Sequence, residues 1–204
     1  MNNPLTLSTF AAPARPLNIP LNVAAPEGGW TWPPTSVTLI AGDREAILVD
    51  TLPALEESLE ALAGDRLELE GHEVVAVAAG RSDISHSSYL YVPDLKAVIV
   101  GDIAYNDVHP TLVDSDHHTR QDWIDTLVGV QALKPEIVVA AHRREDAAND
   151  AQVLADTISY IEEADRLLAE GPSAAQFIEH MLAAHPTRLN VTTLVYSAAL
   201  LGLK

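Results

Sequence analysis

Residues 91–110 read Tyr-Val-Pro-Asp-Leu-Lys-Ala-Val-Ile-Val-Gly-Asp-Ile-Ala-Tyr-Asn-Asp-Val-His-Pro, and this stretch decides the fold. A Pro-Asp turn leads into an apolar, β-branched run at 97–100, a pattern typical of a buried strand. Polar side chains follow directly, among them Asp102, Tyr105 and His109. A carboxylate just after a buried strand lies at the rim of a sheet, on a rigid support. We therefore expect the chemistry of the protein here, the alternative being an ordinary Gly-Asp turn.

Length, charge and composition restrict the class of protein. A chain of 204 residues suits one domain with a sizeable core. The net charge of -17 argues against a nucleic acid or membrane partner, because both demand a basic face. The absence of cysteine excludes disulfides and thiolate metal sites. The N-terminus shows neither a basic segment nor an unbroken apolar run, so we expect no signal peptide and a cytoplasmic protein.

The chain divides into a proline-rich arm and one domain. Prolines recur through residues 1–34, which predicts an extended arm without helix. Trp30 and Trp32 in this arm suit packing aromatics, with an edge strand or a lid over a pocket as the alternative. Residues 35–204 are expected to form a single domain that ends in helices.

Hydrophobic periodicity and turn residues predict the elements of this domain. The expected strands span 36–40, 46–49, 67–69, 74–78, 89–92, 97–100 and 137–140, the first four as two hairpins. The expected helices span 53–62, 120–133, 151–169, 173–184 and 193–203.

Two further places offer chemistry. The polar loop Gly-Arg-Ser-Asp-Ile-Ser-His-Ser-Ser at 80–88 contains Arg81 and His86. The strand expected at 137–140 delivers His142 at its end. Both follow predicted strands, where a scaffold positions functional side chains.

Several segments, in this order, resemble the metallo-β-lactamase superfamily, in its branch of bacterial metallo-hydrolases. They are Thr-Leu-Ile-Ala-Gly-Asp-Arg-Glu-Ala-Ile-Leu-Val-Asp at 38–50, the stretch at 91–109, Trp-Ile at 123–124 with Ala-Leu-Lys-Pro at 132–135, Val-Val-Ala-Ala-His at 138–142 and His-Pro-Thr-Arg-Leu-Asn at 185–190. The resemblance implies an α/β (α+β) fold, a truncated αββα sandwich of two sheets with a C-terminal helical segment.

The resemblance also implies a zinc site, where a metal-bound water attacks the substrate. By position, Asp102 looks like the metal-bridging aspartate and His142 like the last histidine ligand. Asp50 matches an aspartate of the family that is usually structural.

The chain departs from the family at the metal site. The family signature His-x-His-x-Asp-His is absent, and the third histidine ligand is replaced by Arg81, which cannot ligate zinc. Two ligands do not hold a catalytic zinc tightly. His86 or His109 would have to supply a third, and otherwise each is an ordinary histidine. We expect no cofactor, with zinc as the alternative.

Arg81 suggests a physical replacement for the metal. If its guanidinium occupies the space of the lost ion, it can pair with Asp102 through a bidentate hydrogen bond. Loss of stability or activity in Arg81→Ala tests this hypothesis.

Three functions compete. The first is a metal-independent small-molecule enzyme of isomerase, cyclase or lyase type that uses Asp102, His142, His86, Tyr105 or His109 as acid and base, beside the cation of Arg81. The second is a zinc-dependent hydrolase with a rebuilt metal site. The third is a non-catalytic binding or structural remnant. Because a lost block would uncover an apolar sheet face, we expect the arm or a second copy of the chain to cover it, and a homodimer as the result.

Overall fold

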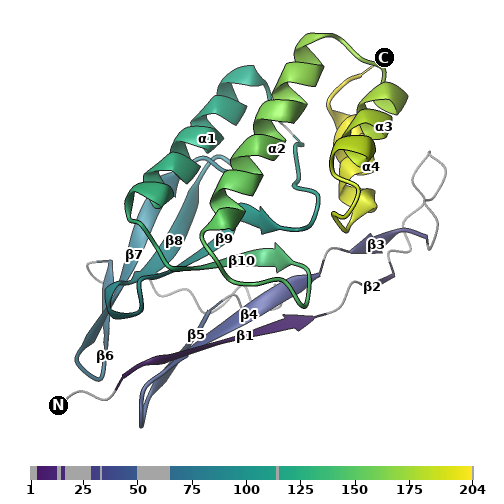
Figure 1. Cartoon of the computed structure of the whole chain (residues 1–204). Coiled ribbons are helices and arrows are strands. Elements are labelled where there is room, and N and C mark those ends of the chain that lie inside the picture. The colour runs from purple at the N-terminus through teal and green to yellow at the C-terminus, as the bar shows by residue number, and fades with distance from the viewer. Residues whose placement is uncertain are drawn as a thin grey trace.

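The computed structural model describes residues 4–12, 15–16, 29–32, 34–49, 65–113 and 115–203. Their strands form one main sheet in the order β1-β4-β10-β9-β8-β7-β6, with β5 paired to β4 (Figure 1). Strands β9 and β10 run parallel and the other neighbours run antiparallel. The bounds are β1 (Thr6–Ala12), β4 (Thr35–Ala41), β5 (Ala46–Val49), β6 (Arg66–Leu69), β7 (His72–Gly80), β8 (Ser87–Val92), β9 (Ala97–Asn106) and β10 (Ile137–Arg143). A short pair, β2 (Arg15–Pro16) and β3 (Thr31–Trp32), lies apart from this sheet.

The main sheet curls, and its concave face encloses a core. Leu5 and Ile40 come from the β1–β4 end, and Leu69 and Val74 come from the β6–β7 end. All four belong to one buried cluster, although these strands lie at opposite ends of the sheet order. Burying such side chains contributes about 1.5–3 kcal/mol each. The two ends of the one curled sheet therefore face each other, as the two sheets of the expected sandwich would.

Helices cover the outer face of the β7–β10 half (Figure 1). They are α1 (His117–Ala132), α2 (Gln152–Ala169), α3 (Ala174–Ala184) and α4 (Val191–Leu200). Trp123 of α1, Tyr160 of α2, Phe177 of α3 and Leu194 of α4 share a second buried cluster with the outward side chains of β9 and β10. Asp116 and Ser173 cap α1 and α3 through capping boxes, so local chemistry fixes where these helices begin. No described helix is both long enough and apolar enough to span a bilayer.

A bulge in β9 shapes the sheet around Asp102. Ala140 pairs with Gly101, and His142 pairs with Tyr105, so β9 advances four residues where β10 advances two. Gly101 has φ 57°, a left-handed conformation that glycine adopts without steric penalty. The extra residues of β9 bend Asp102 out of the regular ladder, beside His142.

The sequence predicted most of these elements. Both expected hairpins form, and the helices expected at 151–169 and 173–184 agree with α2 and α3 within one residue. The strand expected to stop at residue 100 instead continues to Asn106, because the bulge absorbs the Gly-Asp pair that looked like a turn. The helix expected at 120–133 begins three residues earlier, at His117.

The proline-rich arm contributes a strand to the sheet. Residues 6–12 pair with β4 as strand β1, so this part of the arm is an edge of the main sheet. The helix expected at 53–62 and Asp50 lie outside the described residues.

Candidate functional site

Two side chains meet where β9 and β10 run side by side. Nε2 of His142 lies 3.4 Å from Oδ1 of Asp102, a charge contact that is too long for a good hydrogen bond. The side chain of Asp102 is 44% exposed and that of His142 is 17% exposed. Oδ1 of Asp102 is itself buried and has no hydrogen-bond partner among the described residues. Asp102 is therefore the more exposed of the two side chains.

His142 is held by its other nitrogen and by one face of its ring. Nδ1 lies 3.0 Å from the backbone oxygen of Pro34, which can only accept a hydrogen bond. Nδ1 therefore carries a hydrogen, and Nε2 is the ring nitrogen that faces Asp102. The ring of Tyr105 stacks on the imidazole at 5.4 Å between centroids and 25° between planes.

The environment of Asp102 disfavours its ionised form. Burial, the largest influence, raises the pKa of Asp102, and the negative charge of Asp83 raises it further, while His142 lowers it. This carboxyl group therefore holds a proton more readily than an exposed aspartate does.

Asp83 belongs to this site, although the sequence analysis did not select it. The hydroxyl of Tyr105 donates to Oδ2 of Asp83 at 2.8 Å. Burial, followed by Asp83 and Asp102, raises the pKa of Tyr105 well above its ordinary value. The polar loop at 80–88 indicated chemistry, but nothing in the sequence linked Asp83 to a tyrosine on another strand.

Arg81 and His86 lie in the same loop as Asp83, each in its own surroundings. Arg81 lines a cavity of about 640 Å³ between this loop and α1, with Asp122 and Asp125 on the helix side. The charges that act on Asp102 are those of His142 and Asp83. The pairing of Arg81 with Asp102 stays a prediction. His86 is exposed and bonds through Nδ1 to the hydroxyl of its neighbour Ser85, at 2.9 Å.

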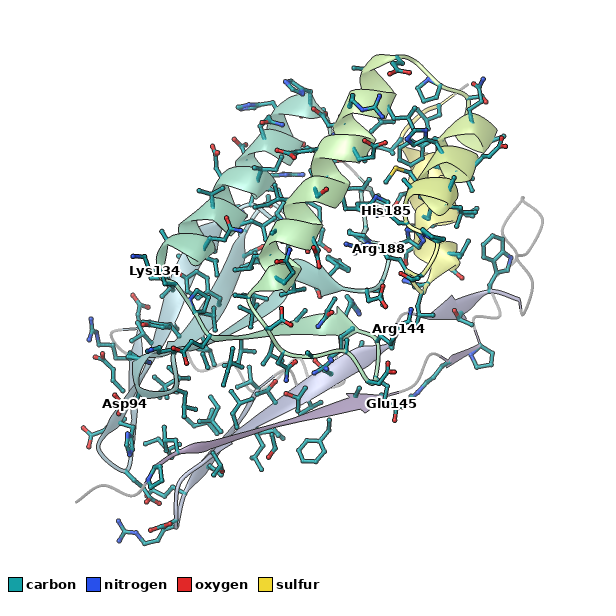
Figure 2. All side chains as sticks on the ribbon, in the orientation of Figure 1. Asp94, Lys134, Arg144, Glu145, His185 and Arg188 are labelled. Atoms are coloured by element: carbon teal, nitrogen blue, oxygen red, sulfur yellow. The ribbon has the colours of Figure 1, made fainter. Side chains whose placement is uncertain are left out.

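His109 lies in a different cluster, under α2. Its side chain is fully buried, and Nδ1 lies 3.0 Å from the hydroxyl of Tyr160. The ring of Tyr160 also contacts His185, at 4.7 Å between centroids, and the guanidinium of Arg188, at 5.0 Å. Burial, with the nearby charge of Arg188, lowers the pKa of His109 to about 3. Figure 2 shows His185 and Arg188 on the side of α2 that faces α3 and α4.

The side chains at this rim do not fit the zinc ion that the resemblance implies. A catalytic zinc takes three protein ligands and a water molecule. Asp102 and His142 supply two, and the guanidinium of Arg81 cannot supply a third. His86 bonds to Ser85 in the loop, and His109 is packed against Tyr160. Across the described ranges, no group of three or more His, Cys, Asp or Glu side chains is arranged to hold a metal.

Asp102 and His142 lie outside the two cavities of the described residues. The walls of the 640 Å³ cavity contain neither Asp102 nor His142. A second cavity, of about 360 Å³, lies at the end of β9 beside His185 and Arg188, and its walls also lack the pair.

Comparisons with known proteins agree with this fold. The family model of the metallo-β-lactamase superfamily matches residues 62–142. A metallo-β-lactamase from Pontibacter korlensis is similar, with a TM-score of 0.55 and 14% identity over 79% of this chain and 96% of that one. The mono-zinc metallo-β-lactamase FIM-1 from Pseudomonas aeruginosa has a TM-score of 0.53 and 11% identity over 80% of this chain and 97% of its own.

Longer relatives match only in part. A metallo-β-lactamase family protein from Thermus thermophilus has a TM-score of 0.46 and 15% identity over 65% of this chain. The chain spans 46% of that protein's length. No curated protein matches the sequence. At these identities the solved structures show a shared fold, and the activity has to be argued from the site.

Proposed function

Because the chain belongs to the metallo-β-lactamase superfamily but lacks its set of metal ligands among the described residues, we propose that it is a small-molecule enzyme that transfers protons without a metal. The contact between Asp102 Oδ1 and His142 Nε2, at 3.4 Å, carries this proposal. Isomerisation, elimination, decarboxylation and cyclisation that pass through an enol or carbanion need a proton taken from or given to carbon, which a positioned carboxylate or imidazole can do.

The geometry gives the two groups different roles. Asp102 is the more exposed member, so its carboxylate takes the proton from the substrate. The proton is then held as a carboxyl on Asp102, and Nε2 of His142 is the acceptor that a hydrogen on Oδ1 reaches when the 3.4 Å contact shortens. Pro34 fixes this role, because its carbonyl keeps the ring hydrogen of His142 on Nδ1. The pair thus has a site for the proton and a partner that holds it there.

A purely structural role accounts poorly for this arrangement. Oδ1 of Asp102 is buried without a hydrogen-bond partner among the described residues, and such atoms are rare in folded proteins. The β9 bulge, with Gly101 in the left-handed region, places the carboxylate there. Bulges and unsatisfied carboxylates are both concentrated at active sites.

Deuterium exchange tests the proposal without knowledge of the product. The protein is incubated in D₂O with 2-oxo acids, 3-oxo acids and 2-hydroxy ketones, and mass spectrometry records deuterium at carbon. We expect at least one class to exchange faster than in buffer, in proportion to protein concentration. Exchange at the buffer rate in every class would contradict proton transfer at carbon.

A further inference from the structure

Asp83 is anchored on both of its carboxylate oxygens. Oδ2 accepts from the hydroxyl of Tyr105 at 2.8 Å, and Oδ1 accepts from the hydroxyl of Ser82 at 2.9 Å. The hydroxyl of Ser82 also lies 2.5 Å from that of Ser87, and the Ser82 amide donates to the oxygen of Ile84 at 3.0 Å. The loop between β7 and β8 is therefore closed on itself and presents Asp83 in a fixed position.

Tyr105 links Asp83 to His142, because its hydroxyl bonds to Asp83 and its ring stacks on the imidazole. It is 2% exposed, and its ring is held edge-on by Trp123 at 6.1 Å and stacked on His142 at 5.4 Å. The hydroxyl of Tyr105 also interacts with the side chain of Thr111. Of the two partners, the carboxylate is the stronger acceptor, because a hydrogen bond to an ionised group is roughly twice as strong as a neutral one.

The imidazole of His142 has two constraints on its orientation. The ring turns about χ2, and the bond from Nδ1 to Pro34 and the stacked ring of Tyr105 both limit that rotation. If Tyr105 tilts, Nε2 turns away from Asp102. Pre-organised sites depend on such supporting contacts.

We propose that Asp83 is a positioning residue of the site, which holds the ring of Tyr105 against His142 and so keeps Nε2 directed at Asp102. The chain of contacts runs from the β7–β8 loop through β9 to β10. Asp83 does not touch the substrate in this account. Only the expected effect on catalysis rests on the proposed function. The orientation of the His142 ring can be measured without a substrate.

NMR of ring-labelled histidine at one fixed pH tests the positioning. The ring current of Tyr105 displaces the His142 ring protons, and Tyr105→Leu gives their unstacked shift. We expect Asp83→Ala to move these signals towards the unstacked shift. Asp83→Asn should leave them near the native shift, because an amide oxygen still accepts from the tyrosine hydroxyl. Asp125→Ala, in the wall of the larger cavity, is the control that should leave them unchanged.

A second variant keeps the test independent of how well Asp83→Ala folds. Tyr105→Phe retains the ring and removes the hydroxyl that binds Asp83. It should displace the His142 signals as Asp83→Ala does, and the double variant should add nothing. Native His142 shifts in folded Asp83→Ala or in Tyr105→Phe would overturn the proposal.

The exchange assay separates this inference from the proposed function. We expect Asp83→Ala to slow deuterium exchange about tenfold and Asp83→Asn to slow it much less, as for supporting contacts at other sites. Displaced NMR signals with no exchange activity in the native protein would retain the positioning role and refute the proposed function. Displaced signals in Asp83→Ala with a native exchange rate would overturn the catalytic consequence of the inference.

Discussion

Asp102→Asn is expected to slow deuterium exchange by about 100-fold to 10,000-fold, the range for loss of a general acid–base group. Asparagine has nearly the same shape but cannot take a proton from a substrate. Its amide can instead donate to the lone pair of His142 Nε2, which lies 3.4 Å from the present oxygen. The contact at the rim is then satisfied while the proton acceptor is gone.

Stability measured on the same variant separates a catalytic from a structural role. Because Asp102→Asn removes a buried carboxylate oxygen that lacks a partner among the described residues, the free energy of unfolding in urea should hold or rise. His118→Gln, whose parent side chain is 84% exposed on α1, is the matched control for both measurements. An Asp102→Asn protein with native exchange rates, or one that merely unfolds, would contradict the assignment.

The stability of the protein is expected to fall steeply in acid because of His109. Its pKa is lowered from 6.5 to about 3 in the folded chain, chiefly by burial. Between these values the unfolded chain binds a proton that the folded chain does not, so acid favours unfolding. The contribution is complete above the unfolded pKa and decreases as the pH falls towards 3. From pH 7 to pH 4 the loss is on the order of 3 kcal/mol.

Other titratable groups around His109 also lower the stability of the fold in acid. The test therefore compares the native protein with a variant that lacks only the histidine. Burial lowers the pKa of His185, and Arg188 lies beside both rings. Arg166 and His180 hold the pKa of Glu163 at about 2, and this carboxylate also loses its pairing in acid. The negative charges of Asp107 and Asp156 also act on Arg188 of this cluster.

Urea unfolding of the native protein and His109→Gln at pH 7 and pH 4 isolates the histidine. Glutamine can keep a bond to the hydroxyl of Tyr160 and does not titrate. We expect the native protein to lose about 3 kcal/mol more than the variant over this range. His118→Gln should follow the native protein. Parallel losses in the native protein and in His109→Gln would show that His109 is not held neutral by the fold.

Local signals made part of this site predictable. The β-branched run at 97–100 and the run ending at His142 mark two buried strands, and neighbouring strands bring their ends together. The family resemblance placed Asp102 and His142 at one metal site, and the structure places their side chains in contact.

The remaining features depend on contacts between distant parts of the chain. Tyr160, which bonds to His109, is 51 positions away in the sequence. Asp83 and Tyr105, which bond to each other, are 22 positions apart. Periodicity and turn chemistry carry no information about such pairs. The prolines made residues 1–34 look like a simple extended arm. In the structure, residues 6–12 of that arm form strand β1, which pairs with β4.

Deuterium exchange by chelator-treated protein tests the central claim most directly. The protein is dialysed against a chelator, its zinc content is measured, and exchange is followed before and after zinc is returned. We predict the same rate in all samples, with far less than one zinc per chain after dialysis, because Asp102 and His142 transfer the proton by themselves. Activity lost on dialysis and restored by about one zinc per chain would contradict the account and identify a rebuilt metal site.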